Sequence, residues 1–228
     1  MDAVKSLQFK AMPNLVSLKN ISATCVFLFM AVSVVDGGTY VEVKDRAPLN
    51  KHVKQYVRTY IQQNRKNLYD IKRRSSSPFV MMDGVFRHYG LPVQLKYLAV
   101  VESELRTKAV SEVGAVGPWQ LMPETARILG LKINSRYDER KNYYKSTRAA
   151  ARHLKGLHEE FGDWFLVFAA YNAGDGAVNS AIRQSGTKDF WKLQKYLPGE
   201  TREYVKKFIA TYYFFEGAYN LPAAVKAW

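Results

Sequence analysis

Glu102 is a carboxylate within an otherwise apolar stretch, an arrangement that suits acid–base chemistry. It lies in the run KYLAVVESELR, residues 96–106. If this run is helical, one stripe holds four residues at spacings of three, four and three: Leu95, Leu98, Glu102 and Leu105. Ser103 then falls on the wetter side. A buried glutamate is costly unless it is paired or protonated. Glu102 is therefore either a rim residue that reaches water or a general acid whose proton is retained by an apolar pocket.

The remaining residues form none of the common metal-binding or nucleotide-binding motifs. The chain has four histidines, none of them paired at ligand spacing: His52, His88, His153 and His158. Its single cysteine is Cys25. GxSxG, P-loop and dinucleotide-binding glycine patterns are missing from the sequence. We therefore expect no metal and no cofactor, which leaves carboxylate chemistry or binding alone.

Two further stretches combine polar side chains with glycines. GAVGPWQLMPETA, residues 114–126, contains Gln120, whose amide both donates and accepts hydrogen bonds. By itself this stretch is typical of a turn between two helices. AAYNAG, residues 169–174, ends an apolar segment with Tyr171 and Asn172. These two side chains either project into a cleft or serve as core residue and helix cap.

The elements that would position these residues are predicted to be helices. Apolar residues keep helical spacing over 53–61, and an amphipathic helix is expected over roughly 79–89. The basic run KRRSSSPF, residues 72–79, is expected to be a loop or a helix break. Pro92 suits the first position of the helix that bears Glu102.

The second half of the chain continues this helical pattern. The alanine-rich segment 146–162 is predicted to start at Ser146, and DWFLVFAAY, residues 163–171, is apolar on every side, as in a core helix. A long C-terminal helix is predicted with Thr201 as its N-cap. No convincing alternating strand pattern is present, so the fold class is mainly α.

Composition and charge set the domain organisation and the location. The chain has 228 residues, of which 47% are hydrophobic, and a formal net charge of +14, which favours an anionic partner. A basic start precedes the uncharged run at residues 21–35, the layout of a secretory signal. We predict a signal peptide or membrane anchor over 1–38, a helical extension over 39–77 and one domain over 78–228. The protein is expected to be exported to the periplasm or cell envelope.

Taken together, the motifs resemble a known enzyme family. VESELRTKAVSEVGAVGPWQLMPETA, residues 101–126, resembles the catalytic stretch of the soluble-lytic-transglycosylase-like enzymes, which act on the bacterial cell wall. AAYNAG and ETREYV, residues 200–205, look like the second and third signatures of that family, in the same order. The resemblance is strongest to the membrane-bound lytic murein transglycosylase D type. Pro118-Trp119 departs from the Leu-Met pair of many relatives, which affects groove detail.

The resemblance implies a fold, a reaction and a set of roles. The fold would be a lysozyme-like helical bundle around a glycan-binding groove. Glu102 would be the single acid/base: it protonates the oxygen between N-acetylmuramic acid and N-acetylglucosamine, then takes the proton of the C6 hydroxyl, which closes a 1,6-anhydro ring. Ser103 would have a structural role beside the acid, and Ser111 would contact an acetamido group. The resemblance assigns five more residues to the groove, with the last near Glu102: Gln120, Met122, Tyr171, Asn172 and Tyr204.

Three alternatives compete with this interpretation. A hydrolytic lysozyme-type muramidase would need a second carboxylate, and none stands out, since Glu104 points to another side of the helix. A non-catalytic peptidoglycan-binding protein would not need Glu102. A nucleic-acid partner is not expected, because of the export signal and because no recognised binding module is present. Peptidoglycan strands are the expected partner, and a retained N-terminal anchor would add membrane association.

Overall fold

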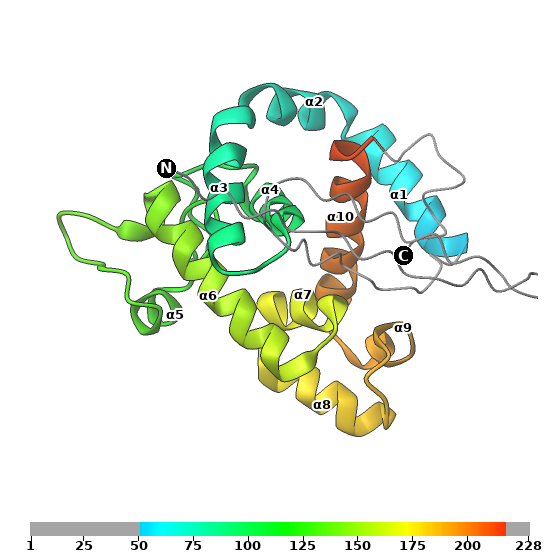
Figure 1. Cartoon of the computed structure of the whole chain (residues 1–228). Coiled ribbons are helices and arrows are strands. Elements are labelled where there is room, and N and C mark those ends of the chain that lie inside the picture. Colours follow the sequence, from blue (N-terminus) through cyan, green and yellow to red (C-terminus); the bar gives the residue numbers. More distant parts are fainter. Residues whose placement is uncertain (1–50, 218–228) are drawn as a thin grey trace, which may run out of the picture. The chain divides into compact units, whose positions relative to one another are not determined.

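The computed structural model describes residues 51–217, and this part of the chain is mainly helical (Figure 1). Its first half contains α1 (Lys51–Gln63), α2 (Arg65–Arg74), α3 (Ser76–His88), the 3-10 helix η1 (Val93–Lys96) and α4 (Tyr97–Ser103). Its second half contains α5 (Pro123–Ile128), η2 (Glu139–Lys141), α6 (Tyr143–Phe161), α7 (Trp164–Ala173), α8 (Asp175–Ser185), α9 (Phe190–Leu193), η3 (Gln194–Tyr196) and α10 (Gly199–Phe215). Residues 51–217 contain isolated bridges but no strand. The predicted mainly α class is confirmed.

The helix that bears Glu102 is shorter than predicted. Pro92 has an extended ψ of 129° and precedes the 3-10 turn η1, so α4 begins only at Tyr97. The helix ends at Ser103, and Leu105 lies beyond it with a positive φ of 64°. The predicted stripe therefore does not continue past Glu102 as a helix. Ser103 is 2% exposed, so its placement on the wetter side was wrong.

Two other predicted helix starts were wrong by a few residues. α6 starts at Tyr143, and the side chain of Asn142 caps it by accepting a hydrogen bond from the Lys145 backbone N–H at 2.9 Å. Ser146 is instead a buried residue of its first turn. α10 starts at Gly199, so Thr201 is a buried residue of the first turn and not the N-cap.

The helical spacing at the start of the described chain is confirmed. α1 buries the apolar side chains of Val53, Val57 and Ile61. The loop or helix break expected over 72–79 is a helix break at one residue, because α2 ends at Arg74 and α3 begins at Ser76. Ser75 makes this tight connection by donating its side-chain hydroxyl to the carbonyl of Lys72 at 2.9 Å.

α7 is the central helix of the core, as its composition predicts. Every residue from Trp164 to Ala170 is buried. The side chain of Asp163 caps the helix by accepting from the Leu166 N–H at 2.9 Å. α7 packs against α6, α8 and α10. A helix surrounded in this way can be apolar on all sides.

α10 connects the other parts of the bundle. It packs against α1, α4 and α7, and in Figure 1 it lies between α1 and the α4 region. Tyr204, on the first half of α10, is thereby brought to the helix that carries Glu102. All helices from α1 to α10 belong to one compact unit.

The signal peptide or anchor expected at residues 1–38 lies outside the described residues, as does the start of the extension expected at 39–77. Within residues 51–217, no helix combines the length and the apolar character needed to span a membrane.

Candidate active site

Glu102 lies in the last turn of α4 and is partly buried, so the residue keeps limited contact with solvent. The hydroxyl of Tyr204 donates a hydrogen bond to Glu102 Oε1 at 2.6 Å. These two residues are 102 positions apart in the chain and meet because α10 packs on α4. The proximity of Tyr204 to Glu102 implied by the resemblance is thus present.

The environment of Glu102 favours its protonated form. Burial raises its pKa to about 7, opposed by the hydrogen bond from Tyr204 and reinforced by the negative charge of Glu200. Near neutral pH the carboxyl is therefore a proton donor for part of the population and a base for the rest. This matches the requirement for a general acid–base group whose pKa lies near the working pH.

Two phenols near the carboxyl, one buried and one partly buried, stay neutral. Burial raises the pKa of Tyr204 well above its usual value, and the negative charge of Glu102 raises it further. The same two causes raise the pKa of Tyr171. Tyr171 lies on α7 and donates its hydroxyl to the Trp119 carbonyl at 2.8 Å. α7 and α10 therefore each place a neutral phenol near Glu102, and α10 also carries Glu200, whose charge acts on the same carboxyl.

The loop after α4 holds the glycine-rich residues, and its polar side chains mainly stabilise its own shape. Gln120 has a positive φ of 43°, and its amide donates to the Gly117 carbonyl at 2.9 Å. The hydroxyl of Ser111 accepts from the Ala115 N–H at 2.9 Å. The hydrogen bonds of both side chains stay within the loop. They can bind a ligand only through the hydrogen-bond donors and acceptors that these bonds leave unused.

The other predicted groove residues differ in exposure. Met122 is 41% exposed and directly precedes α5, so it presents an apolar side chain to solvent. Asn172 is partly buried near the end of α7, one residue after Tyr171. An open pocket of about 510 Å³ is lined by residues 105–110, in the loop after α4.

The departure at Pro118-Trp119 is explained by packing. Trp119 is fully buried, stacks edge-on against Phe86 and donates its indole N–H to Thr147 at 3.0 Å. It is a core residue that fixes the back of the loop. The larger side chain therefore changes the core behind the loop and not its exposed surface.

Ser103 has the structural role that the resemblance implies. Its hydroxyl donates to the Pro118 carbonyl at 3.0 Å and accepts from the Arg106 N–H at 3.1 Å. The residue next to Glu102 thus connects α4 to the glycine-rich loop.

Arg140 was missed by the sequence analysis, although it holds that loop in place. Arg140 is 5% exposed, and its guanidinium donates to the carbonyls of Gly114 at 2.9 Å and Leu121 at 3.0 Å. Asp138 accepts from the same guanidinium at 2.7 Å, which neutralises the buried charge. Only the spacing of an acid and an arginine two residues apart hinted at this pair, and that signal is common in loops.

Comparison with known proteins identifies the domain. Residues 87–194 match the family model described as Transglycosylase SLT domain. The chain is 36% identical over 174 residues to membrane-bound lytic murein transglycosylase D of Escherichia coli K12, an alignment that covers 74% of this chain and 38% of that protein. It is also 31% identical over 118 residues to peptidoglycan transglycosylase gp16 of Escherichia phage T7, covering 50% of this chain and 9% of the phage protein. The chain thus spans well under half the length of these relatives.

Solved structures agree with the sequence matches. An inactive mutant of the lytic transglycosylase Slt from Pseudomonas aeruginosa superposes with a TM-score of 0.53 at 26% identity, over 64% of this chain and 25% of that one. The 70 kDa soluble lytic transglycosylase of Escherichia coli superposes with a TM-score of 0.51 at 22% identity, over 77% and 39% of the two chains, which supports the fold alone. The lysozyme-like helical fold expected from the motifs is therefore confirmed. The chain belongs to the transglycosylase SLT-domain family.

Proposed function

We propose that the protein is a peptidoglycan lytic transglycosylase. It cleaves the β-1,4 bond between N-acetylmuramic acid and N-acetylglucosamine and leaves 1,6-anhydro-muramic ends. The observation that carries this proposal is the state of Glu102: a partly buried carboxyl, hydrogen-bonded by a neutral phenol, with a pKa raised to about 7. Such a group can donate a proton and later accept one at neutral pH.

In the first step, Glu102 donates its proton to the glycosidic oxygen, and the bond from that oxygen to C1 of the muramic residue breaks. Because Oε1 accepts the hydrogen bond of Tyr204, Oε2 is the oxygen suited to carry the transferable proton. In the second step, the Glu102 carboxylate takes the proton of the C6 hydroxyl, and that oxygen attacks C1. The ring closes, no water is consumed, and Glu102 is protonated again.

Tyr204 stabilises the carboxylate between the two steps. It is a neutral donor with a strongly raised pKa, so it keeps its proton while Glu102 changes charge. A hydrogen bond to a charged oxygen is stronger than one to a neutral oxygen. Ser111, Gln120, Met122, Tyr171 and Asn172 are proposed to line the glycan groove around this pair.

The specific alternative is a hydrolase with two carboxylates, in which Glu200 would be the second one. It is exposed at the start of α10, and its charge contributes to the raised pKa of Glu102. In an inverting or retaining hydrolase this second carboxylate would activate water or attack C1 itself. In the proposed mechanism it only adjusts the proton affinity of Glu102.

Mass spectrometry of products released from purified peptidoglycan distinguishes the two mechanisms. Intramolecular attack gives anhydro ends that are about 18 mass units lighter than hydrolysed ends, since one water is not incorporated. Glu102→Gln should lose activity by about 10²-fold or more, the range for loss of a general acid. Glu200→Gln should keep the same products. Reducing ends, together with a comparable loss in Glu200→Gln, would instead assign a hydrolase.

The proposed partner is peptidoglycan, and the proposed location is the cell envelope. Relatives of this chain are named for action on murein or peptidoglycan, and one of them is named as membrane-bound. Residues 1–38 would provide export or anchoring, which N-terminal sequencing of the exported protein tests. The net charge of +14 suits attraction to anionic wall polymers, an effect that salt reduces.

A further inference from the structure

The chain turns sharply directly after the helix that carries Glu102. Glu104 and Leu105 have φ values of 55° and 64°, in the left-handed region that side chains with a Cβ disfavour. Two successive residues of this kind persist only where the surroundings hold them. We call residues 103–106 the corner. Because Glu102 is in the last turn of α4, the position of its carboxyl depends on how the corner is held in place.

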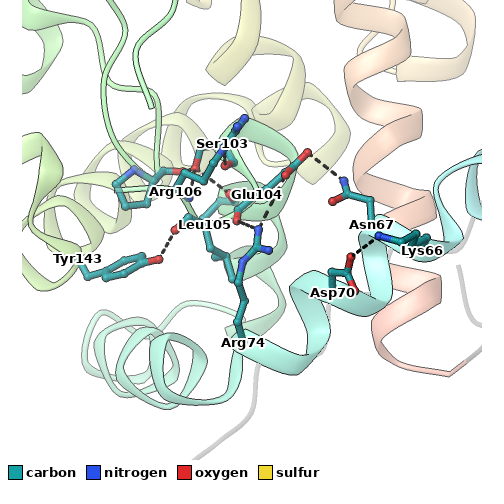
Figure 2. Close-up of polar contacts among 11 residues, drawn as sticks. Lys66, Asn67, Asp70, Arg74, Ser103, Glu104, Leu105, Arg106 and Tyr143 are labelled. Atoms are coloured by element: carbon teal, nitrogen blue, oxygen red, sulfur yellow. Dashed lines mark hydrogen bonds and ion pairs between the residues drawn. The ribbon is translucent and has the colours of Figure 1, made fainter. Parts of the chain in front are cut away.

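Helix α2 holds the corner through both the main chain and the side chain of Glu104 (Figure 2). Arg74 donates to the Glu104 backbone carbonyl at 2.9 Å, and its guanidinium lies 3.8 Å from Glu104 Oε2. Asn67 donates its side-chain amide to Glu104 Oε1 at 2.9 Å. Asn67 and Arg74 are seven residues apart, two helical turns, so they lie on the same face of α2.

The neighbouring carbonyls of the corner are held from α6 and from within the corner itself. The hydroxyl of Tyr143, at the start of α6, donates to the Leu105 carbonyl (Figure 2). The side chain of Arg106 donates to the Ser103 carbonyl at 2.9 Å. Each of the three carbonyls that follow Glu102 therefore accepts a hydrogen bond from a side chain, and the one in the middle depends on Arg74.

α2 lies outside the segment that matches the family model, which begins at residue 87. The neighbouring helix α1 contacts α10, the helix that carries Tyr204. Lys206 lies over the ring of Tyr56 at 5.4 Å from the ring centre; burial raises the pKa of the Tyr56 hydroxyl, and the nearby negative charge of Glu203 raises it further. These two α10 residues flank Tyr204, so the α1–α2 pair supports both the helix of Glu102 and the helix of Tyr204.

We propose that Asn67 and Arg74 are positioning residues for Glu102, and that α1–α2 is thereby part of the catalytic unit. The proposal rests on the role of Glu102 as the acid. Loss of the contacts with Glu104 lets the corner relax, which moves the carboxyl relative to the glycosidic oxygen and admits water. The rate of the chemical step falls, while substrate contacts made by the loop and by α7 are retained.

A neighbouring residue provides the matched control. Arg73 is also on α2 and also an arginine, but its side chain pairs with Asp70 instead of the corner. In Arg74→Ala we expect kcat to fall by about fivefold or more, because small misplacements of reacting groups cost large factors in rate. KM should change by less than about twofold, as expected when an interaction acts on the chemical step. Arg73→Ala should match the wild type in both constants.

The pH dependence separates positioning from a merely structural role. Water entering the corner weakens the burial that raises the pKa of Glu102. The alkaline limb of the rate profile should therefore move to lower pH in Arg74→Ala and stay unchanged in Arg73→Ala. A variant that only lost stability would keep the wild-type limb at temperatures where it is folded.

A second set of variants decides the question if Arg74→Ala does not fold. Glu104→Gln keeps a side-chain oxygen that accepts from Asn67, whereas Glu104→Ala removes it. We expect Glu104→Gln to retain most of the wild-type kcat, and Asn67→Ala and Glu104→Ala to lose it to similar extents. Lys66→Ala, which removes only the exposed pair with Asp70, is the control for Asn67→Ala.

An NMR titration of the Glu102 carboxyl carbon tests positioning without any substrate. The pKa of Glu102 should fall in Arg74→Ala and in Asn67→Ala but not in their controls. If the wild type releases no product, the proposed function fails, and the titration still reports on the corner. Equal kcat and equal Glu102 pKa in each variant and its control would overturn the positioning role, as would an effect on KM alone.

Discussion

Replacing Glu102 by glutamine should make the protein inactive and also more stable at neutral and alkaline pH. The pKa of Glu102 is raised from 4.5 to about 7 in the folded state, chiefly by burial. Between these two values the folded protein holds a proton that the unfolded chain releases. Stability therefore falls as pH rises through this window and remains lower above it. Glutamine does not titrate, and its side-chain oxygen can still accept the hydrogen bond of Tyr204.

The size of this effect follows from linkage between protonation and folding. Each pKa unit corresponds to about 1.4 kcal/mol, so ionising Glu102 in the folded state costs about 3 kcal/mol in full. At pH 5 less than about 1 kcal/mol of this cost is present, and at pH 8 nearly all of it is. The stability of Glu102→Gln relative to the wild type should therefore increase by about 2 to 3 kcal/mol between pH 5 and pH 8.

Urea denaturation of both proteins at pH 5, 6, 7 and 8 measures this difference. All other titrating groups, including His153, are present in both proteins, so their contributions cancel in the comparison. Most of the change should occur below pH 7, where the folded wild type still holds the proton. A difference in unfolding free energy that is the same at every pH would refute the raised pKa and, with it, the assignment of Glu102 as a proton donor near neutral pH.

Two further outcomes follow from contacts around the site. Tyr204→Phe removes a hydrogen bond that lowers the pKa of Glu102, so the alkaline limb of the pH–rate profile should move to higher pH while the rate falls; an unmoved limb would contradict that contact. Gly117→Ala should reduce thermal stability far more than Gly114→Ala, as measured by thermal unfolding. Both glycines have φ near 86° (85° and 87°), but a Cβ at Gly117 would lie 2.1 Å from the Arg140 carbonyl oxygen and a Cβ at Gly114 would meet nothing within 4 Å. Equal losses would show that strain alone, and not the close approach, makes Gly117 necessary.

Local features of the sequence were sufficient for the fold class and for the candidate acid. The run from Trp164 to Ala170 is apolar on every side, and such a segment can satisfy its side chains only in a core. Glu102 was recognisable because a carboxylate within an apolar stripe is costly to bury. The adjoining motifs resembled those of a family in which such a carboxylate is the catalytic acid. Helix starts at Pro92, Ser146 and Thr201 were predicted wrongly, because several nearby residues could begin each helix and tertiary packing selects among them.

The tertiary structure alone decided what surrounds the acid. The contact of Tyr204 with Glu102 joins residues 102 positions apart, and the contact of Arg74 with Glu104 joins residues 30 apart. Pairs of this kind depend on how helices pack, which local propensity and spacing do not encode. The left-handed corner after Glu102 is likewise invisible in the sequence, because Glu104 and Leu105 have no intrinsic preference for it. They adopt it where side chains from α2 and α6 bind the Glu104 and Leu105 carbonyls, which lie just beyond the end of α4.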